Sequence, residues 1–231
     1  MANHLDLEEQ EQLDQLKHFW KQYGNQITWL LILVLGAFAS WNAYQYWQRN
    51  QSAQASVMFD EVVKVTRSND PAKVERAFND MKERFSTTTY TFQAGLLSAK
   101  ALFEAGKSDS AKAILTWLAE KSGDTGYASI ARLRLAALLM DSKSYDDALR
   151  VLDGVTDSAF VALSADRRAD VFMAQGKKSE AKEQYQKAYA SFDQRTEYRR
   201  LVEVKLNALG VDPSVVPSSK STEAGKAEAS K

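Results

Sequence analysis

The sequence predicts an all-α protein in which one transmembrane helix precedes a solenoid of about four helix pairs. Two observations predict this class. The chain of 231 residues has one long stretch without charged side chains, from Gln22 to Gln48. Beyond that stretch, apolar residues recur at helical intervals, and alanines return about 35 residues apart around short turns. Strands are predicted nowhere in the sequence.

Residues 1–24 predict a short amphipathic leader helix. Asp6 and Glu9 have the spacing of a capping box, and Gly24 predicts a C-cap that ends the helix. The apolar side chains that recur at helical intervals between these signals are Leu13, Leu16, Trp20 and Tyr23. Such a helix lies on the membrane surface, docks on a partner protein, or is a solvated lead-in, and the sequence leaves these three alternatives open.

Residues 25–48 predict a transmembrane anchor in contact with membrane lipid. A helix from Ile27 to Trp47 reaches roughly 30 Å, the thickness of the hydrocarbon core of a bilayer. Aromatic side chains at both ends of the run predict interfacial belts. These side chains are Trp29 at one end and Trp41, Tyr44, Tyr46 and Trp47 at the other.

A cleavable signal peptide is the alternative interpretation of this run. Ala37-Phe38-Ala39 resembles a cleavage site that follows an apolar segment of suitable length. The preceding segment is acidic and long, whereas a signal peptide has a short basic one. Cleavage would also leave the aromatic residues from Trp41 to Trp47 at a new N-terminus without a membrane. The anchor interpretation is therefore preferred.

Basic residues near the anchor do not fix its orientation. Lys17 and Lys21 on one side nearly balance Arg49 and Lys64 on the other. A short leader without a cleavable signal, followed by a larger C-terminal domain, favours a cytoplasmic leader. We therefore expect residues 49–210 to form a domain on the opposite side of the membrane.

The domain begins with helical sequence that contains no glycine or proline until Pro71. Asp70 predicts an N-cap with Pro71 at the first helical position, and this helix continues to about Phe85. A last helix is expected from about Thr196 to Leu209. Residues 211–231 are poor in apolar side chains and predict a disordered tail.

Three helix-turn-helix units lie between these two ends of the domain. The small residues Ala111, Ala148 and Ala181 take equivalent places, about 35 residues apart, where two helices cross closely. This is the period of tetratricopeptide repeats, so the sequence predicts a tetratricopeptide-like solenoid. The first pair, residues 52–85, fits the period loosely, as terminal repeats often do.

Composition disfavours nucleic-acid binding and enzymatic chemistry. The 30 basic and 30 acidic residues balance, so no basic field for nucleic acid is expected. There is no cysteine, and both histidines, His4 and His18, precede the anchor. The domain therefore lacks the imidazole of a catalytic Ser-His pair or a histidine metal site. We expect no enzyme, no metal site and no cofactor.

The repeat register instead predicts a binding surface. Stacked helix pairs leave a concave face that is lined by the first helix of each pair. The residues expected to point toward this face, as a candidate partner-binding groove, are Gln93, Leu96, Lys100, Phe103, Ile130, Leu133, Arg134, Ala137, Leu163, Asp166, Arg167, Asp170 and Met173. The set mixes apolar and charged side chains, which favours extended or helical apolar segments as ligands.

The order of leader, anchor, aromatic exit and repeats resembles the YfgM family, ancillary subunits of the bacterial Sec translocon. The residues that carry the resemblance are Glu9, Gln10, Leu13, Leu16, Lys17, Phe19, Trp20 and Gly24 in the leader, and Trp41, Tyr46 and Trp47 at the exit. The resemblance implies a single-pass protein of the bacterial inner membrane, with a cytoplasmic N-terminus and a periplasmic C-terminal domain.

The resemblance also implies partners. These are Sec translocon subunits, a periplasmic chaperone similar to PpiD, and unfolded or newly exported polypeptides that the protein would assist. An envelope assembly adaptor or tether without a connection to the translocon would need the same anchor and the same repeats, and it is the alternative function.

Overall fold

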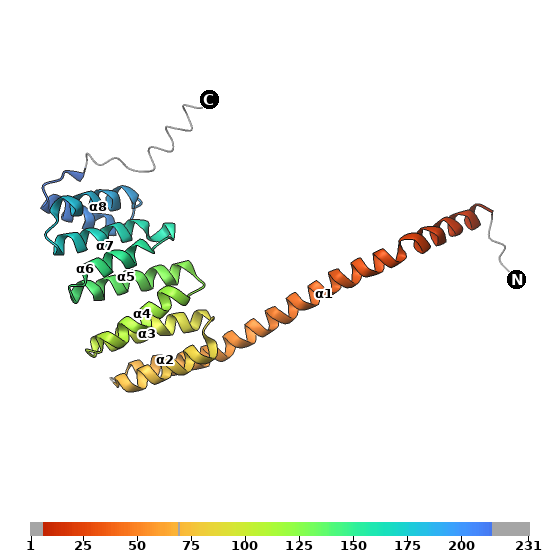
Figure 1. Ribbon diagram of the computed structural model, residues 1–231, viewed down its shortest axis with the longest axis horizontal. Helices are drawn as coiled ribbons and strands as arrows, with labels where there is room; N and C mark the ends of the chain where they lie inside the picture. The colour runs from red at the N-terminus through yellow and green to blue at the C-terminus, as the bar shows by residue number, and fades with distance from the viewer. Residues whose placement is uncertain (1–6, 69, 214–231) are drawn as a thin grey trace, which may run out of the picture. The chain divides into compact units, whose positions relative to one another are not determined.

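The computed structural model describes residues 7–68 and 70–213, and in these residues it contains helices and no strand (Figure 1). The chain divides into two compact units, Met1–Ala53 and Gln54–Lys231. The second unit is a stack of helices that follow one another in chain order. The prediction of an all-α solenoid is confirmed.

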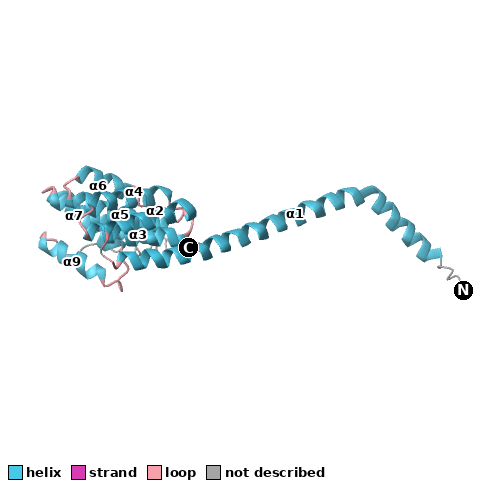
Figure 2. Cartoon of the chain, turned by 90° about the horizontal axis from the view of Figure 1, so that it is seen from below, coloured by secondary structure: helices cyan, strands magenta, loops and turns pink. Residues whose placement is uncertain are grey.

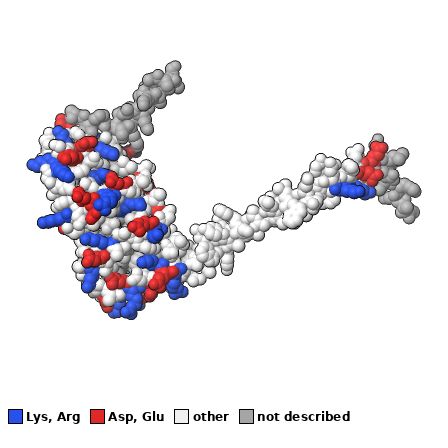
Figure 3. All heavy atoms as spheres, viewed as in Figure 1, with Lys and Arg blue, Asp and Glu red and all other residues white. Residues whose placement is uncertain are grey.

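Helix α1 spans Leu7–Thr66. In the described part of the chain it is the one helix that is long and apolar enough to cross a membrane, and its most apolar window is entirely exposed. Figure 3 shows acidic and basic side chains interspersed over the repeat domain, whereas the middle of α1 is uncharged. This uncharged segment contains the predicted anchor.

The predicted helix end at Gly24 is wrong. Helix α1 continues through this residue, and the indole of Trp20 covers it so closely that an added Cβ would lie 3.2 Å from the ring. Thr28 Oγ1 also donates a hydrogen bond of 2.8 Å to the Gly24 carbonyl. The glycine therefore serves close packing inside a helix rather than a left-handed cap.

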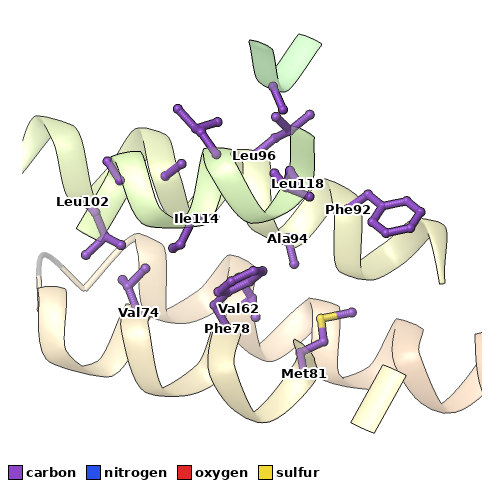
Figure 4. Packing of buried hydrophobic residues seen from close by; sticks show 14 of the residues in the cluster. Val62, Val74, Phe78, Met81, Phe92, Ala94, Leu96, Leu102, Ile114 and Leu118 are labelled. Atoms are coloured by element: carbon purple, nitrogen blue, oxygen red, sulfur yellow. The ribbon is translucent and has the colours of Figure 1, made fainter. Parts of the chain in front are cut away.

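Helix α2 spans Pro71–Phe85 and begins as predicted. The Asp70 carboxylate accepts a hydrogen bond of 3.2 Å from the Lys73 amide, and Pro71 stands at the start of the helix. Figure 4 shows how α2 joins the end of α1 to the stack, because Val74 and Phe78 of α2 meet Val62 of α1 and the side chains of the next pair.

Three complete helix pairs follow α2. Helices α3 (Thr89–Glu104) and α4 (Ser108–Lys121) form the first pair, α5 (Thr125–Asp141) and α6 (Tyr145–Asp153) the second, and α7 (Val161–Ala174) and α8 (Lys178–Ser191) the third. A short 3-10 helix, η1 (Ser158–Phe160), precedes α7, and α9 (Tyr198–Ala208) follows α8. In Figure 2, α4 and α6 lie together on one side of α3 and α5.

The small residues expected at the close crossings are confirmed. Ala111, Ala148 and Ala181 each have no exposed surface, and each lies on the second helix of its pair. A larger side chain at these places would have to displace the first helix, because protein interiors are densely packed. The alanine spacing in the sequence is thus the spacing of the helix crossings.

A left-handed residue follows the first helix of every pair. Gly106, Lys143 and Gly176 have φ values of 76°, 60° and 78°. The amide of the next residue then bonds to a carbonyl five residues back, as Lys107 does to Leu102 at 2.8 Å. Gly210, with φ 71°, ends α9 in the same way.

The apolar core of the domain consists of three clusters. One joins the end of α1 to α2, α3, α4 and one face of α5. A second joins the other face of α5 to α6 and to Val171 of α7. The third joins Ala165 and Ala169 of α7 to α8, α9 and Val211. Val211, which the sequence assigns to the tail, is thus buried, and residues 214–231 lie outside the described residues.

Candidate partner-binding groove

A hollow of about 410 Å³ opens between α3, α4 and α5. Four of its lining residues belong to the predicted groove, namely Lys100 and Phe103 of α3 and Arg134 and Ala137 of α5. They meet because each pair lies three residues apart and therefore on one side of its helix. The other lining residues are Ala99, Leu115, Leu138 and Asp141.

The hollow combines an apolar floor with charged edges. Its floor includes Leu115 and Leu138, whose side chains are buried among the helices. Phe103 is 40% exposed, which is unusual for so large an apolar side chain in this domain. Lys100, Arg134 and Asp141 provide two positive charges and one negative charge. This arrangement suits an apolar side chain of a ligand, with polar groups beside it.

Arg134 of α5 also connects this helix to α3. One terminal nitrogen of its guanidinium donates a hydrogen bond of 3.0 Å to the backbone carbonyl of Leu96. Lys100 is less constrained, because its ammonium lies 3.8 Å from the exposed Glu104 carboxylate. The arginine is thus held in place, while the lysine is free to follow a ligand.

Sequence reasoning did not include four of the residues that line the hollow, namely Ala99, Leu115, Leu138 and Asp141. The repeat register considers only the first helix of each pair, so it does not include Leu115, which comes from the second helix α4. Leu138 and Asp141 lie one helical turn beyond Arg134 and Ala137, and this spacing is the signal that identifies them.

The remaining predicted residues do not form one continuous open surface. Leu96 and Leu133 are buried, with 9% and 7% of their surface exposed. Gln93, Ile130 and Leu163 are half-buried, and Gln93 donates a hydrogen bond of 2.9 Å to the Tyr127 hydroxyl. Met173 is 37% exposed but lies on α7, away from the hollow.

Asp166 is placed inside the protein rather than on a binding face. Its side chain has no exposed surface, and it accepts hydrogen bonds from Tyr198 at 2.8 Å and from Lys205 at 2.7 Å. Both partners belong to α9, which covers this part of α7. The expectation that Asp166 points into a groove is therefore wrong, because the additional helix occupies the space beside it.

Asp170 completes this buried polar network. One of its oxygens accepts hydrogen bonds from Lys205 at 2.7 Å and from Tyr185 at 2.6 Å, and the other lies 3.3 Å from Arg167. Lys205 thus bridges two carboxylates. The network fastens α9 to α7 and α8, and three of its members, Tyr185, Tyr198 and Lys205, had no signal in the local sequence.

The network makes the stability of the domain sensitive to alkaline pH. Burial, followed by the hydrogen bond to Asp166, raises the pKa of Tyr198 well above its ordinary value. Burial and the hydrogen bond to Asp170 do the same for the pKa of Tyr185. In the unfolded chain a tyrosine ionises near pH 10. The stabilisation by these hydroxyls is therefore complete below about pH 10 and is lost as the pH rises further.

Tyr198→Phe is expected to weaken this alkaline destabilisation. The variant loses a hydrogen bond to a charged group, which costs about 1.5 to 3 kcal/mol at neutral pH. Its free energy of unfolding then falls less steeply than that of the parent above about pH 10. Urea unfolding at several pH values measures both effects, with Tyr145→Phe, outside the network, as the matched control. Parallel pH profiles for parent and Tyr198→Phe would contradict the assignment.

Comparison with known proteins identifies a family and several relatives that resemble this chain. Residues 17–211 match the family described as a tetratricopeptide repeat-like domain. A protein of Neisseria gonorrhoeae named ancillary SecYEG translocon subunit is 30% identical over 210 residues, which are 90% of this chain and all of the relative. No solved structure matches the chain.

Two further relatives carry the same name. The protein of Haemophilus influenzae is 31% identical over 203 residues, covering 88% of this chain and 98% of the relative. The protein of Escherichia coli is 24% identical over 206 residues, covering 88% of this chain and 97% of the relative. The family match from residue 17 to residue 211 thus includes the end of the leader, the apolar segment and the repeats.

Proposed function

The chain belongs to the family of ancillary SecYEG translocon subunits with a tetratricopeptide repeat-like domain, and from this premise we propose that it associates with the Sec translocon and assists exported proteins. In this proposal residues 25–48 anchor the chain in a bacterial inner membrane. Residues 1–24 face the cytoplasm, and the repeats of residues 49–210 lie in the periplasm. Its further partners are a periplasmic chaperone and unfolded or newly exported polypeptides.

The anchor is supported by the uncharged segment of α1. Side chains such as Leu33, which is 68% exposed, have no protein neighbours that would cover them. Burying such a side chain in lipid stabilises the inserted state by about 1.5 to 3 kcal/mol. A run of exposed apolar side chains of this length is stable only in a membrane or a comparably apolar setting.

The binding role is supported by the hollow between α3, α4 and α5. An extended or helical segment of a client can place one apolar side chain on the floor beside Phe103, while Lys100 and Arg134 contact its polar groups. The exposed phenyl ring of Phe103 is the observation that carries this proposal. Such a site recognises apolar character rather than one sequence, which suits many exported chains.

Phe103→Ser is expected to reduce client binding several-fold. The serine removes most of the apolar contact area at the edge of the hollow, and because the ring is already 40% exposed the packing of α3 is preserved. Photo-crosslinking from position Lys100 in intact membranes measures the effect and identifies the neighbours. Leu133 is unsuitable for this test, because it is buried and its replacement would disturb the core.

The matched control is Val204→Ser, which also replaces an exposed apolar side chain, 63% exposed, by serine. Val204 belongs to α9, which does not line the hollow. The control is expected to leave the crosslinks from Lys100 unchanged. Undiminished crosslinks in Phe103→Ser would move the binding site to another face. Neighbours that include neither translocon subunits nor exported chains would instead favour a tether of the envelope.

A further inference from the structure

The N-terminal part of α1 carries an apolar stripe that no part of the described chain covers. The stripe consists of Leu13, Leu16, Phe19, Trp20 and Tyr23, and all five side chains are exposed, Leu16 by 63% and Trp20 by 58%. The rings of Phe19 and Tyr23 pack on each other with centroids 5.2 Å apart. At about 100° per residue these five residues share roughly one third of the helix circumference.

The opposite side of the same turns is polar. Glu11, Asp14, His18 and Lys21 lie there, and Lys17 borders the stripe, where its ammonium is 3.4 Å from the Asp14 carboxylate. Between residues 11 and 24 the two acidic and two basic side chains cancel. This part of the helix is therefore strongly two-sided but carries no net charge, with histidine neutral.

A local irregularity of the helix at Gly24 and Thr28 lies between this amphipathic part and the uncharged segment. Thr28 returns its hydroxyl to the Gly24 carbonyl at 2.8 Å, an arrangement that bends helices. Gly24 lets the Trp20 indole lie directly over the backbone, where a Cβ would come within 3.2 Å of the ring. Figure 2 shows a bend in the N-terminal part of α1.

We infer that residues 11–24 lie flat in the headgroup region of the membrane, with the apolar stripe buried in lipid. The stripe continues directly into the exposed apolar segment of residues 25–48, so the lipid that covers one is available to the other. The aromatic side chains of the stripe, such as Trp20 and Tyr23, have the amphipathic character that headgroup depth favours. The bend in the N-terminal part of α1 allows the helix to turn from the membrane plane into the bilayer.

The lack of net charge defines the lipid that this segment requires. Attraction to anionic headgroups needs an excess of basic residues, whereas here Glu11 and Asp14 balance the two lysines, and Asp6, Glu8 and Glu9 add negative charge just before the segment. Burial of the five apolar side chains is then the main stabilising contribution. Binding to the interface is expected in zwitterionic membranes, and anionic lipid is not expected to strengthen it.

The absence of cysteine makes the full chain suitable for a direct test. Single cysteines at each position from Glu11 to Tyr23 are labelled with an environment-sensitive fluorophore, and the purified protein is reconstituted into phosphatidylcholine vesicles. Labels on the stripe, such as position Leu16, are expected to report an apolar environment. Labels on the opposite face, such as position His18, are expected to report water, so that the signal oscillates with a period of 3.6 residues.

The inference rests on the proposed insertion of residues 25–48, and a label at Leu33 keeps the two claims apart. An apolar signal at Leu33 with an oscillating leader supports both. An apolar signal at Leu33 with a uniformly water-exposed leader overturns the interfacial leader alone, whereas a polar signal at Leu33 overturns the anchor and the leader together. Oscillation that appears only after translocon-containing membranes are added assigns the stripe to a protein partner and overturns the lipid assignment.

Discussion

Lys205→Met is expected to lower the free energy of unfolding of the repeat domain by about 3 to 5 kcal/mol. Methionine keeps the length and the apolar stem of the lysine but removes the cation that Asp166 and Asp170 share at 2.7 Å each. Asp166 is fully buried, and Asp170 is partly buried, with 18% of its side chain exposed. The fully buried Asp166 carboxylate would remain without a positive partner, and Asp170 would keep only Arg167 at 3.3 Å.

Urea unfolding of a fragment that starts at Arg49, followed by circular dichroism, measures this effect. The matched control is Arg150→Met, which removes an ion pair of similar length, 3.0 Å to Asp147, between side chains that are 76% and 52% exposed. That change is expected to cost less than about 1 kcal/mol, because solvent already screens the pair. Equal effects of the two substitutions would show that the network around Lys205 is as weak as a surface pair.

Leu33→Arg is expected to weaken membrane insertion by about 2.5 to 3.5 kcal/mol, the cost of an arginine near the centre of a membrane helix. Leu33 lies within the run from Ile27 to Leu35, which contains no polar side chain besides Thr28 and the indole of Trp29. The guanidinium would have to reach the interface from the middle of the bilayer or remain unsolvated. A large fraction of the protein molecules would then fail to insert into the membrane.

Resistance to alkaline carbonate extraction measures the inserted fraction. Gln48→Arg is the matched control, because it adds the same side chain beside Arg49 at the end of the uncharged segment, where the cost falls toward zero. Full extraction resistance of Leu33→Arg would contradict the assignment of this segment. Recovery of a mature chain that begins near Ser40 would favour the cleaved signal peptide instead.

Local chemistry explains which parts of the fold were predictable. The start of α2 was found because Asp70 and Pro71 are adjacent in the sequence and act on the same helical turn. The helix crossings at Ala111 and Ala148 were predictable because each repeat needs a small residue at the equivalent position, which recurs at a fixed spacing in the sequence. Gly24 was misinterpreted because a glycine that makes room for the Trp20 ring has the same sequence appearance as a glycine that ends a helix.

The candidate site was predictable only in part, for a different reason. Lys100, Phe103, Arg134 and Ala137 follow from the repeat register, because each lies on the first helix of a pair. Asp166 follows the same register but is buried, since α9 returns to cover it. Tyr198 and Lys205 follow Asp166 by 32 and 39 positions in the sequence. Such long-range contacts depend on where a later helix packs, and no local sequence pattern specifies this.

The division of the core into three clusters makes the domain a chain of nearest neighbours. Helices α5, α6 and α7 each contribute to two clusters, so cooperativity passes along the solenoid through these shared helices. In such a one-dimensional system the terminal unit frays before the interior. In the proposed binding mode, a client between α3 and α5 would restrain the two clusters that share α5, while α9, which belongs to the third cluster, would retain its own local opening equilibrium.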